Sequence, residues 1–166
     1  MTFSNENMIK RDRLRFQKNK LSANLTLLAI VLNALYFVSI YKTDVGDYYY
    51  TFLIGISVVY NLLFMLTSFL ASEGVKAYKV GYSYVLMGLG AGQIARIFII
   101  PLQAKNATLV VNGVEAAAME NSHFIRLCAY LAASAVLCIA AGIINLSKAQ
   151  MLAHRYDEIE RMEKGS

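Results

Sequence analysis

The chain has 166 residues, of which 57% are hydrophobic and 16% charged, with a mean hydropathy of +0.46 and a formal net charge of +5. Soluble domains carry about 25% charged residues, so this composition argues against a water-soluble protein. The positive charges gather in clusters that flank long apolar runs, a pattern that indicates membrane topology rather than nucleic-acid binding.

Four apolar runs are long enough to cross a bilayer, which takes roughly 20 residues. The leader, the four runs and the tail cover residues 1–20, 21–41, 49–71, 80–102, 124–147 and 148–166. A soluble bundle is disfavoured because each helix would lack a polar face, and a β-barrel because the runs do not alternate. The first run is also too long for the core of a secretory signal. We therefore predict an all-α membrane protein with a four-transmembrane-helix bundle.

Basic residues lie mostly on one side of the predicted membrane. Twelve Lys and Arg residues fall in the leader, the second connection and the tail, whereas the other side holds Lys42, Lys105 and Arg126. The positive-inside rule then places both termini in the cytoplasm. We expect an integral protein of a bacterial cytoplasmic membrane, whose basic leader contacts anionic lipid headgroups.

Tyrosines cluster around the short connection between the first two runs, at Tyr36, Tyr41 and residues 48–50. Tyrosine rings favour the headgroup level, where the ring is in apolar surroundings and the hydroxyl is in water. Aromatic anchoring therefore explains the cluster better than a ligand cage.

The third run carries glycines and an arginine inside an otherwise hydrophobic stretch. Gly88, Gly92 and Arg96 are spaced by four residues and so share one helix face. Small residues allow the close approach by which helices associate in lipid, and the fourth run offers a matching set. We predict packing, between the third and fourth spans or between molecules, through Gly88, Gly92, Ala129, Ala133, Ser134 and Gly142.

Arg96 has two interpretations, because an embedded cation costs about 2.5–3.5 kcal/mol on insertion scales and is often functional. The favoured one is structural: the side chain snorkels toward the outer headgroups, pairs with an outer carboxylate or binds a lipid phosphate. In the other, Arg96 joins Gln93, Asn33 and Asn61, which lie at similar depth, in a polar site for an anionic solute. Hydrogen bonds between helices are the simpler explanation of those three amides.

The second outer connection contains Asn112-Gly113 between β-forming residues. This dipeptide is a strong turn signal and predicts a small β-hairpin. After the fourth run, Leu152, Tyr156, Ile159 and Met162 repeat at helical spacing, which predicts an amphipathic cytoplasmic helix.

Catalytic and metal-binding patterns are absent from the sequence. All eleven carboxylates lie outside the apolar runs, and the two cysteines lack metal-ligand spacing. We expect no enzyme activity, cofactor, metal or nucleic-acid partner. The predicted function is a multi-pass accessory or scaffold subunit that packs helices in a homo-oligomer or a larger membrane complex. The alternative is a small oligomeric channel or transporter with an anion or lipid-phosphate site at Arg96.

Overall fold

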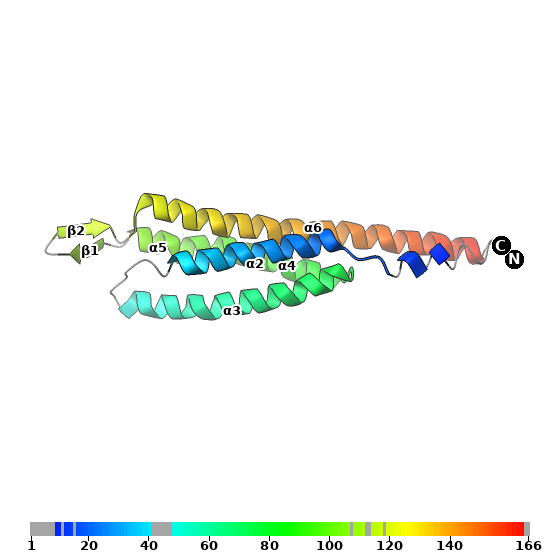
Figure 1. Ribbon diagram of the computed structural model, residues 1–166, viewed down its shortest axis with the longest axis horizontal. Helices are drawn as coiled ribbons and strands as arrows, with labels where there is room; N and C mark the ends of the chain where they lie inside the picture. Colours follow the sequence, from blue (N-terminus) through cyan, green and yellow to red (C-terminus); the bar gives the residue numbers. More distant parts are fainter. Residues whose placement is uncertain are drawn as a thin grey trace.

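The computed structural model describes residues 9–10, 12–14, 16–40, 48–106, 108–111, 114–117 and 119–164. Four of its helices are long and apolar enough to cross a membrane. They are α2 (Lys20–Ile40), α3 (Tyr48–Lys76), α4 (Val80–Ile99) and α6 (Asn121–Lys164). These helices run side by side along the long axis, as Figure 1 shows, so the chain is a multi-pass helical bundle.

The helices form a closed ring in which α6 packs along α4 and α2, and α3 packs against α2 and α4. At one end, here named the basic end, α2 begins, α3 ends and α4 begins, with Lys20, Lys76 and Lys79 at those positions. The other end is named the loop end. The first described residues and the end of α6 both lie beyond the basic end (Figure 1).

Buried residues repeat in alternating steps of four and three along the helices. On α2 they are Ser22, Thr26, Ala29, Asn33, Tyr36 and Ile40. On α3 they are Ser57, Asn61, Phe64, Ser68, Ala71 and Val75, and on α6 Leu127, Leu131, Ser134, Cys138, Ala141 and Asn145. This seven-residue repeat is typical of left-handed bundles, in which side chains of one helix fit between those of its neighbour.

The interior of the bundle combines apolar clusters with many small and polar residues, whereas its outside is largely apolar. Buried positions include asparagines, serines and an arginine, while large side chains such as Leu62, Leu66 and Phe69 are more than half exposed. A water-soluble bundle does not expose so many large apolar side chains, since exposed apolar area of this extent promotes association in water. The distribution therefore agrees with helices that face lipid.

The run predicted as the third span, residues 80–102, contains one helix and the start of another. Helix α4 ends at Ile99, and Pro101 opens a separate short helix, α5 (Pro101–Asn106). Proline is tolerated in the first turn of a helix but cannot donate the hydrogen bond that a continuing helix requires. Residues 103–106, which the sequence assigned to a loop, are therefore helical.

Two short strands follow α5 at the loop end. Strand β1 (Thr108–Val111) pairs antiparallel with β2 (Val114–Ala117), with Thr108 opposite Ala117. The predicted Asn112-Gly113 turn and the short connection at 41–47 lie outside the described residues. Beyond the strands, α6 continues through the predicted boundary at residue 148 as one unbroken helix.

Candidate functional site

Arg96 on α4 points into the bundle and is only 4% exposed. Its Nη1 donates hydrogen bonds to Asn61 Oδ1 at 2.8 Å and to Asn33 Oδ1 at 3.3 Å. Its Nη2 donates to the backbone oxygen of Ser57 at 3.5 Å and also to the hydroxyl of that serine. One guanidinium therefore joins α4 to both α2 and α3.

Two tyrosine rings cover the guanidinium. Its Cζ lies 4.4 Å from the ring centre of Tyr36 on α2 and 5.0 Å from that of Tyr60 on α3. Both distances are within the range of cation–π attraction, which is stronger in surroundings without water. Gly92 makes room for this arrangement, because a Cβ atom there would lie 2.6 Å from the Tyr60 hydroxyl.

A buried amide network completes this group. Gln93 Nε2 donates to Asn33 Oδ1 at 2.9 Å, so this oxygen accepts from both Gln93 and Arg96. Within the described part of the chain, no hydrogen-bond partner lies near the buried atoms Asn33 Nδ2, Asn61 Nδ2, Gln93 Oε1 and Tyr60 Oη. We name as the arginine cluster the residues Asn33, Tyr36, Ser57, Tyr60, Asn61, Gln93 and Arg96.

The structure brings together all four residues that the sequence proposed as an intramembrane polar site, Arg96, Gln93, Asn33 and Asn61. Sequence reasoning missed Ser57 and Tyr60, and it assigned Tyr36 to an interfacial anchor although this side chain is fully buried. The sequence did contain a signal for two of these residues, because Tyr36 follows Asn33 by three residues and Asn61 follows Ser57 by four. Each pair therefore shares a helix face.

The expected snorkelling of Arg96 toward the headgroups is not what the structure shows. The guanidinium lies beside Asn33, seven residues before the end of α2, which corresponds to roughly 10 Å of helix from the loop end. Of the outer carboxylates proposed as partners, Glu120 is exposed, and the side chains of Asp44, Asp47 and Glu115 lie outside the described residues. Neutral amides and hydroxyls, rather than an exit to the headgroups, receive the hydrogen bonds described above.

Small residues mediate the contact between α4 and α6, as the sequence suggested, but through a partly different set. A Cβ at Gly142 would lie 2.8 Å from the backbone oxygen of Ser83, and one at Gly90 would lie 2.6 Å from Ile139. Ser134, also on α6, is buried and donates to the backbone oxygen of Ala29 at 3.0 Å. Gly90, which was not predicted as a packing residue, makes the contact with α6 that was one of the two expected for Gly88.

Three of the predicted packing residues face outward. Gly88 has no atom within 4 Å of an added Cβ, and Ala129 and Ala133 are exposed on α6. Gly88 faces outward because the inward face of α4 follows steps of three and four, through Leu86, Gly90 and Gln93, rather than steps of four alone. Contact between molecules, the other arrangement predicted for these residues, stays a prediction.

A second polar group lies at the basic end and was not predicted. Asn145 on α6 accepts from Asn19 Nδ2 at 3.0 Å and donates to Ser83 Oγ at 2.8 Å and to the backbone oxygen of Lys79 at 3.3 Å. Asn19 also accepts from the backbone N–H of Ser22 at 3.4 Å, as a residue that caps the start of a helix does. This asparagine cluster, defined as Asn19, Ser22, Ser83 and Asn145, ties the starts of α2 and α4 to α6.

Neither cluster resembles a metal centre, since no group of three or more His, Cys, Asp or Glu residues in the described ranges could hold an ion. Comparisons with protein-family models, with curated proteins and with solved structures find no match for the chain. The arrangement itself can do two things. It can hold helices together through buried hydrogen bonds, and it can present unused donors beside a buried cation.

Proposed function

We propose that the protein is a multi-pass membrane accessory or scaffold subunit, which acts by packing its helices in a homo-oligomer or a larger membrane complex. The observation that carries this proposal is the set of hydrogen bonds that Arg96 makes inside the bundle. Its side chain is committed to Asn33, Asn61 and Ser57 inside the bundle, where it stabilises contacts among three helices. A bundle whose embedded cation is held by hydrogen bonds between its own helices suits a scaffold.

The outer face of α4 is the surface we propose for assembly. Gly81, Gly88, Ala91 and Ala95 are all exposed and follow one another at helical spacing. A second helix can approach closely along Gly88, Ala91 and Ala95, which lie between the exposed rings of Tyr84 and Phe98, and close approach drives helix association in lipid. On α6, exposed Ala129 and Ala133 offer a second surface of the same kind.

We also propose that both termini lie in the cytoplasm, in a bacterial plasma membrane. Support comes from the distribution of charge, because Lys18, Lys20, Lys76, Lys79 and Lys148 all belong to the basic end. Short connections with an excess of lysine and arginine stay on the cytoplasmic side. Labelling of single cysteines added at either end, in right-side-out and inverted vesicles, tests this orientation.

The scaffold proposal is tested by comparing Gly88→Leu with Gly55→Leu. Both glycines are exposed and have no atom within 4 Å of an added Cβ, but Gly55 lies on α3. Oligomer size in nanodiscs, measured by mass photometry, should fall for Gly88→Leu and remain at the wild-type value for Gly55→Leu. Equal sizes for wild type and both variants would contradict assembly through α4.

A small oligomeric channel or transporter is the second candidate function, with an anion or lipid-phosphate site at Arg96. One observation favours it: the buried Nδ2 atoms of Asn33 and Asn61 have no acceptor among the described residues. An anion beside the guanidinium would supply acceptors for both. Anion flux into liposomes, lost in Arg96→Gln but kept in Arg126→Gln, would support transport, whereas no flux from intact wild-type oligomers supports the scaffold.

A further inference from the structure

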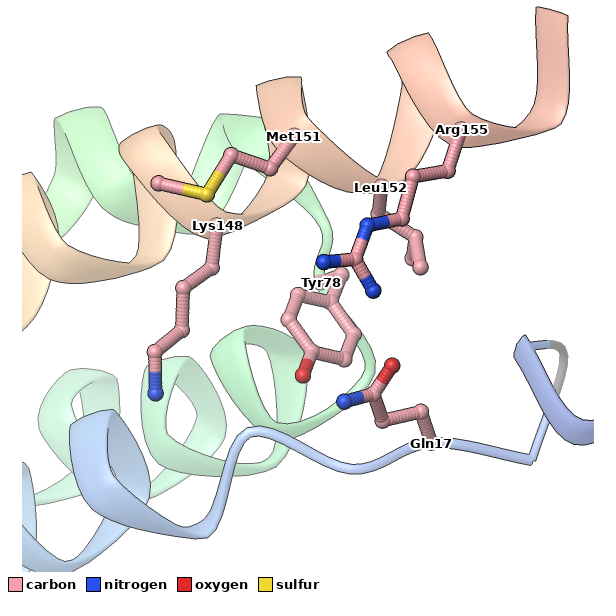
Figure 2. A pocket seen from close by; sticks show the side chains of 6 residues that line it. All are labelled: Gln17, Tyr78, Lys148, Met151, Leu152 and Arg155. Atoms are coloured by element: carbon pink, nitrogen blue, oxygen red, sulfur yellow. The ribbon is translucent and has the colours of Figure 1, made fainter. Parts of the chain in front are cut away.

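A hollow at the basic end is separate from both polar clusters and is lined by two basic side chains, Lys148 and Arg155. It has a volume of about 150 Å³, and its walls come from the segment before α2, the connection between α3 and α4, and α6. We name it the basic groove, lined by Gln17, Tyr78, Lys148, Met151, Leu152 and Arg155. Figure 2 shows Tyr78 between Lys148 and Arg155, with Gln17 opposite the tyrosine hydroxyl.

The polar atoms of the groove are those that recognise a phosphate. Arg155 offers a planar fork of N–H donors, Lys148 a compact charge, and Gln17 and Tyr78 neutral donors. None of the six lining residues is acidic, and no described carboxylate lies within ion-pair distance of either cation. Arginine and lysine together match the several acceptor oxygens of a phosphate group better than a single carboxylate.

The depth of the groove points to a lipid as the source of that phosphate. Lys148 lies one turn beyond Asn145 and donates to Asn19 Oδ1 at 3.4 Å, which places it level with the start of α2. The ends of spanning helices lie where the hydrocarbon gives way to headgroups. Met151 and Leu152 provide an apolar wall beside the cations, against which an acyl chain can lie.

Backbone strain marks the same place. Tyr78 has a backbone φ of 57°, in the left-handed region, just after the end of α3. Two hydrogen bonds close this helix end: Tyr78 N–H donates to Val75 O at 3.1 Å, and Lys79 N–H donates to Gly74 O at 3.1 Å. Glycine usually occupies this position at a helix end, since a side chain is disfavoured there. The ring of this tyrosine lines the groove, so the strained residue and the candidate site coincide.

We propose that the basic groove binds the phosphate of an anionic lipid headgroup, held by Lys148 and Arg155 with Gln17 and Tyr78 as further donors. This site is independent of the function proposed for the arginine cluster, which lies toward the loop end of the bundle. The positive charge of the basic end also attracts anionic lipid to this end of the bundle.

The test uses the full chain in detergent micelles and measures binding by microscale thermophoresis at constant ionic strength. The probes are dioctanoyl phosphatidic acid, dioctanoyl phosphatidylcholine and inorganic phosphate. Arg155→Gln should weaken binding of phosphatidic acid about tenfold, the value expected for one lost charge-assisted hydrogen bond. The control Arg161→Gln removes the same charge from an exposed position of α6 outside the groove and should stay within about twofold of wild type.

A second variant separates binding from folding. Tyr78→Gly should raise the unfolding temperature, because glycine tolerates this φ, and at the same time weaken binding of phosphatidic acid. Equal loss of affinity in Arg155→Gln and Arg161→Gln would overturn the site in favour of diffuse attraction. Inorganic phosphate bound as tightly as the lipid, or phosphatidylcholine bound as tightly as phosphatidic acid, would overturn its assignment to anionic lipid.

Discussion

Gly142 provides the sharpest test of how the bundle is packed. The glycine is buried between α6 and α4, where an added Cβ would lie 2.8 Å from the backbone oxygen of Ser83 and 3.0 Å from Met87 Cγ. Ordinary contacts of a Cβ atom begin at 3.4 Å, so Gly142→Ala requires α4 to retreat by about 0.6 Å at this point. The obstacle is backbone, which cannot turn aside as a flexible side chain can.

The expected cost follows from this displacement. Overpacking a well-filled interior costs about 1–3 kcal/mol, so Gly142→Ala should lower the free energy of unfolding by that amount, less the gain in helix propensity. Gly88→Ala is the matched control, since it makes the same chemical change in a spanning helix with nothing within 4 Å. Because the propensity gain of up to about 1 kcal/mol is common to both variants, their difference isolates packing.

The assay is unfolding by SDS in mixed micelles, followed by circular dichroism. Gly142→Ala should unfold at a lower SDS fraction than wild type, and Gly88→Ala at the same fraction or a higher one. If both variants unfold together, the close contact between α4 and α6 at this level is not what stabilises the bundle. If Gly88→Ala alone is destabilised, Gly88 contacts another helix, either in the same chain or in a second copy.

Three further outcomes follow from the polar interior. Asn145→Ala removes three hydrogen bonds and should lower the free energy of unfolding by about 2 kcal/mol, at roughly 0.6 kcal/mol for each bond. The control Asn24→Ala, on the exposed face of α2, should leave the free energy of unfolding unchanged in the same SDS titration. Arg96→Lys should cost about 1–2 kcal/mol because a lysine cannot reach both Asn61 and Ser57, whereas wild-type stability would show that charge alone suffices. Cys138, which is fully buried, should react with a maleimide in native micelles only after SDS unfolds the bundle, and early labelling detected by mass spectrometry would contradict its burial.

The residues of the arginine cluster show which parts of a buried site can be predicted from a sequence. Arg96, Gln93, Asn33 and Asn61 could be selected because polar groups inside apolar runs seek one another in a medium that offers no other partners. Tyr36 was assigned to the membrane interface, because its position near the end of a span fits an anchor as well as it fits the helix face shared with Asn33. The choice between the two requires knowing which way α2 is turned.

The direction of Arg96 was beyond sequence reasoning for a similar reason. A long side chain near a helix end can reach the headgroups or turn inward, and the residue type alone does not decide between these two directions. In the structure, Asn61 and Ser57 on α3 and the rings of Tyr36 and Tyr60 offer it hydrogen bonds and cation–π contacts inside the bundle. Those partners come from helices that meet only after folding.

The sequence by itself determined the class of the protein, because four apolar runs of sufficient length can satisfy their backbone hydrogen bonds in lipid only as helices. Only the tertiary structure decided which faces of those helices look inward. Glycines alternate through the third span at positions 88, 90 and 92, and packing alone places Gly90 against α6, Gly92 against Tyr60 and Gly88 on the outside. Composition is the same for all three, whereas each contact depends on the rotation of α4 against its neighbours.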